Sequence, residues 1–154
     1  MREPVTAYVG LGSNLGDSAA TLQLALQQLD QLPGTTLTRC SSQYRSAPVD
    51  ACGPDYCNAV AELATRLSAP ELLGELQRLE GLAGRARPYR NAPRTLDLDL
   101  LLYGDARIDS ATLVLPHPRM WQRAFVVLPL AELAPARVPA QTLQALSAQR
   151  IARL

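Results

Sequence analysis

Residues 94–104, RTLDLDLLLYG, place two carboxylates one residue apart in the most apolar run of the chain. Side chains alternate between the two faces of a β-strand, so Asp97 and Asp99 would share one face while Leu98 points to the other. Their Cα atoms would then lie about 7 Å apart. Three leucines follow without alternation, which predicts a strand that is buried on both faces at its far end. Alternation alone would favour two solvated acids on a half-exposed strand, so the meaning of the pair depends on its surroundings.

The chain has 154 residues, a length that one domain (1–154) can fill with a substantial core. Hydrophobic residues make up 47% of it and the formal net charge is +1, which gives no support for a nucleic-acid partner or an anionic membrane surface. The sequence begins without a secretory pattern, and no apolar run is long enough to span a bilayer. We therefore expect a cytoplasmic protein, a monomer, with neither nucleic acid nor membrane as a partner.

Apolar periodicity and turn residues predict a core with the element order β-α-β-β-α-β. Ser68 and Glu71 form a capping-box pattern with Pro70 in the first turn, which predicts where the second helix begins. This order is typical of the ferredoxin-like α+β fold, an antiparallel sheet with helices packed on it, here with additional C-terminal elements. We expect strands over 5–11, 36–46, 56–67 and within 94–104, helices over 18–32, 68–84 and 141–150, and a tight turn over 12–14.

Four arginines lie on the segment directly before the acidic strand, which is punctuated by glycine and proline. Like charges this close repel one another unless they are solvated or supplied with anions, and taken alone they would indicate a solvated basic loop. Next to two acids on one face they favour a different interpretation. Carboxylates hold Mg²⁺, Mg²⁺ is commonly shared with substrate phosphates, and arginines neutralise the remaining phosphate charge. The combination predicts a phosphoryl-transfer site, in which two carboxylates could hold a pair of ions. The arginines are Arg85, Arg87, Arg90 and Arg94.

The segment RNAPRTLDLDLL, residues 90–101, resembles the signature of the 6-hydroxymethyl-7,8-dihydropterin pyrophosphokinase family. The resemblance implies a ferredoxin-like fold and transfer of the β,γ-pyrophosphoryl group of ATP to the hydroxymethyl oxygen of the pterin, releasing AMP, in folate biosynthesis. The likeness continues through AYVGLGSNLG (7–16), YRSAP (44–48), PDYCNAV (54–60), QRLEGLAGR (77–85), LPHPRM (115–120) and RAFVVLPLAELAP (123–135).

By position, the resemblance assigns Asp97 and Asp99 to two Mg²⁺ ions that bridge the triphosphate of ATP. It assigns Arg85 and Arg94 to the transferring phosphates, so these four residues are the expected catalytic set. Some members of the family carry an arginine where this chain has Thr112 and an aromatic residue where it has Pro118. The residue that accepts the hydroxyl proton stays open. The expected ATP contacts are Gln77, Glu80, Arg85, Arg87, Arg94, Leu100, His117 and Arg123.

The resemblance also implies a pterin pocket. Tyr56 and Phe125 match the aromatic pair that stacks on the two faces of the pterin ring, where a flat heterocycle gains both buried area and favourable quadrupole geometry. Asn58 matches the side chain that reads the amide edge of the pterin, because a carboxamide offers both a donor and an acceptor. The remaining expected pocket residues are Ser46, Ala47 and Val49.

Two interpretations from other classes compete with the enzyme. A ferredoxin-like module could bind RNA through the arginine segment, but the near-neutral charge and the few aromatic residues argue against it. A regulatory domain could bind a cation through the acidic pair alone, which would leave Tyr56, Asn58 and the arginines without a joint role.

Overall fold

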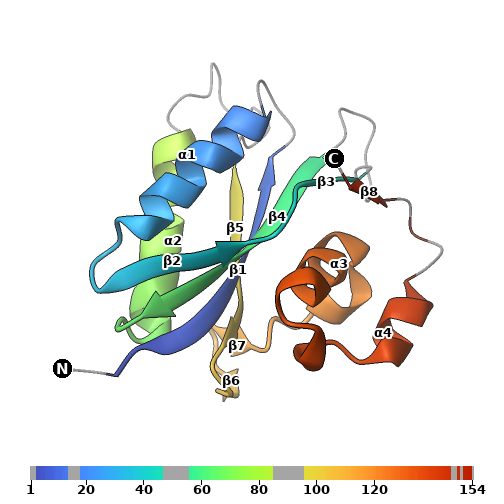
Figure 1. Ribbon diagram of the computed structural model, residues 1–154. Helices are drawn as coiled ribbons and strands as arrows, with labels where there is room; N and C mark the ends of the chain where they lie inside the picture. The colour runs from blue at the N-terminus through green and yellow to red at the C-terminus, as the bar shows by residue number, and fades with distance from the viewer. Residues whose placement is uncertain are drawn as a thin grey trace.

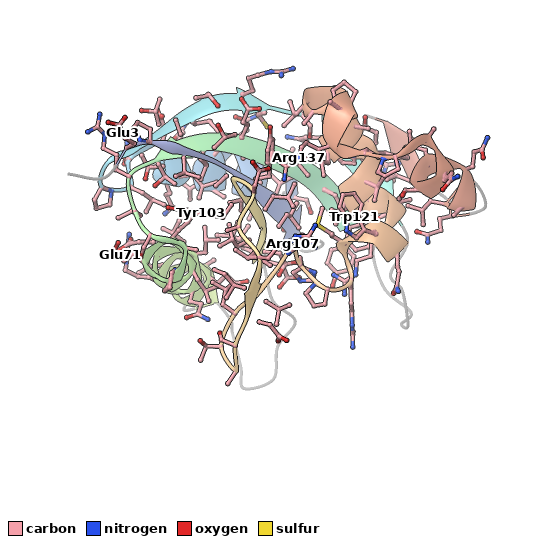
Figure 2. All side chains as sticks on the ribbon, turned by 90° about the horizontal axis from the view of Figure 1, so that it is seen from below. Glu3, Glu71, Tyr103, Arg107, Trp121 and Arg137 are labelled. Atoms are coloured by element: carbon pink, nitrogen blue, oxygen red, sulfur yellow. The ribbon has the colours of Figure 1, made fainter. Side chains whose placement is uncertain are left out.

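The computed structural model describes residues 3–13, 18–46, 56–84, 96–146, 149 and 151–153. These residues form a six-stranded sheet with helices on both faces, α1 and α2 on one side and α3 and α4 on the other (Figure 1). Viewed from below, Glu71 on α2 and Trp121 beside α3 lie on opposite sides of the sheet (Figure 2). The strands are β1 (Val5–Ser13), β2 (Thr35–Cys40), β3 (Tyr44–Ser46), β4 (Tyr56–Thr65), β5 (Asp97–Tyr103), β6 (Ile108–Asp109), β7 (Val114–Leu115) and β8 (Ile151–Arg153); the helices are α1 (Ser18–Asp30), α2 (Ala69–Gly84), α3 (Ala124–Leu133) and α4 (Ala140–Ala145), with 3₁₀ turns η1 (Met120–Gln122) and η2 (Pro135–Arg137).

The strand order is β5-β1-β4-β3-β8, and β2 pairs with β4. β1 is antiparallel to both of its neighbours, β4 and β5. The strand expected over 36–46 is divided into β2 and β3, which pair with different stretches of β4. At the break, the backbone N–H of Ser41 donates to the carbonyl of Val60 and the Ser41 hydroxyl accepts from the Val60 N–H, each at 2.9 Å. The connectivity is the ferredoxin-like one, so the predicted fold class is confirmed.

Two hydrophobic cores lie on the two faces of the sheet. One packs the sheet against α1 and α2 and includes Leu98 and Leu100; the other packs it against α3 and includes Leu101 and Leu102. Alternation sends Leu100 and Leu101 to opposite cores. Leu101 and Leu102 share the α3 core because the register between β1 and β5 shifts between Tyr8 and Val9, which interrupts the alternation there.

The predicted capping box is confirmed. The Glu71 carboxylate accepts from the backbone N–H of Ser68 at 2.8 Å, and the Ser68 hydroxyl accepts from the backbone N–H of Glu71 at 3.2 Å. These bonds satisfy amide groups that have no partner within the first turn of a helix.

Two expectations about local structure are wrong. The strand β1 continues through Gly12 to Ser13, where a turn was predicted. The C-terminal helix ends at Ala145 instead of residue 150, and β8 follows it and pairs with β3. No helix in the described ranges is long and apolar enough to cross a lipid bilayer.

Candidate active site

The two acids of β5 lie on the face of the sheet that carries α3. Burial alternates along the strand, with Leu98 and Leu100 buried in the opposite core and Asp97 and Asp99 half-buried. The carboxylates therefore share one face, as the alternation predicts. Asp97 is the first residue of the strand, and Asp99 is two residues before Leu101 of the α3 core.

A glycine of β1 stands beside each acid. Gly12 pairs with Asp97 and Gly10 pairs with Asp99 in the antiparallel register. On its other side Gly12 pairs with Asn58 of β4, so Asp97, Gly12 and Asn58 form one row across three strands. A Cβ atom at Gly12 would lie 3.1 Å from the Asn58 Nδ2, which is tighter than an ordinary contact. A turn was predicted over 12–14, so the place of Gly12 in β1 between Asp97 and Asn58 was missed.

The polar end of the row is built from Asn58 and Ser46. Both side chains are buried, and the Ser46 hydroxyl donates to the Asn58 Oδ1 at 2.6 Å. Tyr56, two residues before Asn58, pairs with Ser46 and is half-buried. A Cβ atom at Gly12 would be 3.8 Å from the Tyr56 Cδ1, so the Tyr56 ring, the Asn58 amide and the Gly12 backbone meet at one place.

Arg123 and Phe125 lie at the junction of η1 and α3. Arg123 is the residue directly before α3, and its guanidinium carbon is 5.6 Å from the centroid of the Phe125 ring. A guanidinium within about 6 Å of a ring centroid makes a favourable cation–π contact. Phe125 is itself half-buried against the α3 core.

A cavity of about 280 Å³ opens beside β5, which is an edge strand of the sheet. It brings together Asp99, Leu100 and His117, three of the residues that the resemblance places near the nucleotide. Thr112 and Pro118, the two positions that differ from some relatives, also line it. The other lining residues are Leu73, Leu98, Ser110, Ala111, Leu113 and Val114.

The His117 ring is oriented by its neighbours. Its backbone N–H donates to the Leu101 carbonyl at 3.0 Å, and its Nδ1 accepts from the backbone N–H of Arg119 at 3.2 Å. Because Nδ1 accepts, the neutral ring carries its hydrogen on Nε2. Burial lowers the pKa of His117; Asp99 acts in the opposite direction, and Arg123 lowers it further. The negative charge of Asp99 and the positive charge of Arg123 therefore act on the His117 pKa in opposite directions.

Glu80 of α2 supports the acidic strand. Its carboxylate accepts at 2.9 Å from the backbone N–H of Leu98, the residue between the two acids. Gln77 is exposed nearly one turn earlier on the same helix, and Leu73 of the cavity wall lies a further turn back. The spacings of four and three residues place Leu73, Gln77 and Glu80 along one side of α2.

The expected residues Arg85, Arg87, Arg94, Ala47 and Val49 lie outside the described residues. Within the described ranges, no group of three or more histidine, cysteine, aspartate or glutamate side chains converges as a metal site. Mg²⁺ is usually held by one or two carboxylates together with substrate phosphates, and the two half-buried acids with side-chain-free glycines beside them fit that type of site.

The sequence profile of the family described as "7,8-dihydro-6-hydroxymethylpterin-pyrophosphokinase (HPPK)" matches residues 8–135. This chain belongs to the HPPK family. Its function is that of the family, pyrophosphoryl transfer from ATP to hydroxymethyldihydropterin in folate biosynthesis. HPPK membership decides between the three interpretations in favour of the enzyme. The family is generally Mg²⁺-dependent, and it uses ATP and the pterin as substrates.

Two relatives of this HPPK are each named 2-amino-4-hydroxy-6-hydroxymethyldihydropteridine pyrophosphokinase. The one from Haemophilus influenzae is 48% identical over 131 residues, which cover 84% of this chain and 82% of the relative. The one from Synechocystis is 47% identical over 129 residues, which cover 84% of this chain and 66% of the relative. A crystal structure of Plasmodium falciparum HPPK-DHPS with pterin and p-hydroxybenzoate has the same fold, with a TM-score of 0.70 at 15% identity over 88% of this chain and 40% of that one.

Proposed function

We propose that Asp97 and Asp99 hold two Mg²⁺ ions against the triphosphate of ATP, and that the pterin lies on the same face of the sheet beside Tyr56, Asn58 and Phe125. When bound, such ions neutralise the negative charge of the phosphates and orient them for transfer. The side chains of the row from Asp97 to Asn58 then place the two substrates next to each other.

The row itself is the observation that carries the proposal. Asp97 and Asn58 belong to strands on either side of β1, and Gly12 stands between them. Neighbouring strands are about 4.8 Å apart, so the Cα atoms of the acid and the amide are separated by about 10 Å. Because Gly12 has no side chain, the Asn58 amide lies over its backbone, with the Nδ2 3.1 Å from the position of a Cβ atom, and a hydroxymethyl group held by that amide would face the phosphates held at Asp97.

The cavity beside β5 takes the nucleoside part of ATP. Its volume of about 280 Å³ is close to the lower end of small-ligand pockets, and Leu73 and Leu100 give it apolar walls. Asp99 lines the cavity and Asp97 lies two residues along the same strand face, so the triphosphate would run from the nucleoside toward the pterin. Arg85, Arg87 and Arg94 would complete the phosphate site, with Gln77, Glu80, His117 and Arg123 near the nucleotide.

The pterin is held by stacking and by hydrogen bonds. Tyr56 and Phe125 would contact the two faces of the ring, and the Asn58 amide, whose Oδ1 is engaged by Ser46, would present its Nδ2 to the pterin edge. Ala47 and Val49 would line the same pocket.

In the reaction, the hydroxymethyl oxygen forms a bond to the β-phosphorus of ATP. The bond from that phosphorus to the oxygen bridging the α- and β-phosphates breaks, and AMP leaves with the electron pair. The hydroxyl proton is released as the new bond forms. The protein contributes positioning and electrostatic stabilisation, which supply most of the catalysis in phosphoryl transfer.

The test is to supply ATP, Mg²⁺ and hydroxymethyldihydropterin and to measure AMP and ADP. AMP should form without ADP, and Asp97→Ala or Asp99→Ala should each lower its rate by at least about 10²-fold. Asp109→Ala is the matched control, because Asp109 is an exposed acid on the β6–β7 hairpin. A rate near that of the unmodified protein in either site variant, with the same unfolding temperature, would overturn the metal role.

We also propose a single-domain monomer that acts in the cytoplasm. One sheet with a hydrophobic core on each face supports a single domain over the described residues. Sedimentation equilibrium should give the mass of one chain, and twice that mass would contradict the monomer.

A further inference from the structure

The side chain of Gln149 contacts the backbone on both sides of Arg123. Its Oε1 accepts from the N–H of Ala124 at 2.9 Å, and its Nε2 donates to the carbonyl of Gln122 at 2.8 Å. A single carboxamide thus bonds to the residues immediately before and after Arg123. Gln149 is 25 residues after Ala124 in the chain.

The Arg123 N–H donates to the Met120 carbonyl and its carbonyl accepts from Val126 and Val127, whereas the N–H of Ala124 is bonded by Gln149. Arg123 has extended dihedral angles, φ −121° and ψ 111°, between η1 and α3, and its own side chain does not cap α3. The first N–H groups of an α-helix have no partner within the helix and require one from elsewhere. Gln149 supplies the partner of the Ala124 N–H and at the same time binds the end of η1, so one side chain holds both peptide groups that flank Arg123.

Gln149 is itself held on both sides. Its backbone N–H donates to the carbonyl of Leu146 at 3.0 Å, and the Leu146 side chain is buried in the α3 core. Two residues after Gln149, β8 begins and pairs with β3, with Ile151 opposite Ser46. Figure 1 shows β8 at the edge of the sheet beside β3, above α3. The C-terminal segment therefore links the η1–α3 junction to the strand that carries Ser46.

We propose that Gln149 is a positioning residue for Arg123, a role that rests on the proposed function of Arg123 beside the substrates. The match to the HPPK family ends at residue 135, so the proposal concerns a part of the chain that the family profile does not cover. Gln149 holds the Arg123 backbone so that the guanidinium stays over the Phe125 ring, at 5.6 Å from its centroid.

The test is a double-mutant cycle of Gln149→Ala and Arg123→Ala in the full chain, with kcat and both KM values measured. Two lost hydrogen bonds should reduce kcat/KM by about tenfold, chiefly through KM. In the Arg123→Ala background the same change should alter kcat/KM by less than about twofold, because the positioned side chain is gone. A role limited to general stability would give the same loss in both backgrounds.

Gln141→Ala is the matched control, since Gln141 is an exposed glutamine on α4. If Gln149→Ala does not fold, Gln149→Glu takes its place: it keeps the acceptor for the Ala124 N–H and loses the donor to Gln122, and about a threefold loss is expected. Additive losses, no loss on changing Gln149, or an equal loss in Gln141→Ala would each overturn the inference. If Arg123→Ala retains full activity, the proposed function of Arg123 is wrong. The positioning role of Gln149 is then rejected with it, even if Gln149→Ala lowers activity.

Discussion

Ser46 and Asn58 are joined by a 2.6 Å hydrogen bond between two buried side chains on neighbouring strands. The bond fixes which end of the Asn58 amide accepts, because the Ser46 hydroxyl is the donor and Oδ1 the acceptor. A buried carboxamide with its oxygen already engaged has a defined orientation before any ligand binds.

Ser46→Ala removes that donor and should raise the KM for the pterin by about fivefold, the equivalent of one neutral hydrogen bond, while the KM for ATP changes little. Steady-state kinetics with each substrate varied in turn provide the measurement. An equal rise in both KM values would show that Ser46 supports the fold in general and not the pterin pocket.

Gly12→Ala should weaken pterin binding because its new Cβ would come within 3.1 Å of the Asn58 Nδ2. Overpacking of this kind costs about 1–3 kcal/mol, so we expect a rise of about tenfold in the pterin dissociation constant, measured by calorimetry. At Gly10 the added Cβ would meet Leu101 at an ordinary 3.5 Å. Gly10→Ala should therefore leave pterin affinity nearly unchanged, and a similar loss in both variants would contradict the explanation.

Phe125→Ala and Tyr56→Ala should each reduce pterin affinity more than ATP affinity, since both rings are proposed to stack on the pterin. A stacked aromatic pair contributes about 1 kcal/mol in addition to the free energy of burying its apolar surface. Losing this contribution should raise the pterin dissociation constant at least about fivefold. Tyr103→Phe serves as a control for the change of an aromatic residue outside the site, because Tyr103 packs in the α1–α2 core. Equal losses of pterin and ATP affinity would count against stacking.

Glu132→Gln should destabilise the fold by about 2 kcal/mol, because hydrogen bonds to a charged group are stronger than neutral ones. The Glu132 carboxylate accepts from the Ser42 N–H at 2.7 Å, the Ser42 hydroxyl at 3.1 Å and the Tyr44 hydroxyl at 2.9 Å. These hydrogen bonds connect α3 to the start of β3. Urea unfolding is the measurement. Tyr44→Phe removes only one of these bonds and should cost about 1 kcal/mol; a larger loss than in Glu132→Gln would contradict this ranking.

Local patterns in the sequence predicted the parts of the fold that local interactions determine. The alternation of Asp97, Leu98 and Asp99 gave the correct faces of β5, and the Ser68–Glu71 capping box gave the correct start of α2. Both depend on residues that are near one another in the chain.

The missed features depend on distant contacts. Gly12 resembles a turn residue by composition, and only its pairing with both β4 and β5 keeps it in a strand. Residues 151–153 have no strong strand pattern and become β8 by pairing with β3. The helix α3 contains Pro129, and the sequence did not predict it as a helix.

The candidate site divides in the same way. The acidic pair could be found from spacing alone, whereas Tyr56, Asn58, His117 and Phe125 were assigned only through the resemblance to the family. The cavity beside β5 could not be predicted, because its wall includes residues 110–113 between β6 and β7 and Val114 of β7, and the position of this hairpin relative to β5 depends on tertiary contacts. The support of Arg123 by Gln149 had no local signal either, since the two residues are far apart in the chain.

Counting the divalent ions in a complex with a nonhydrolysable ATP analogue and the pterin tests the role of the acidic pair most directly. With Mn²⁺ in place of Mg²⁺, electron paramagnetic resonance should detect two bound ions per chain in the unmodified protein and fewer in Asp97→Asn and Asp99→Asn. Two ions bound with undiminished affinity in both variants would contradict the assignment of Asp97 and Asp99 as the metal ligands.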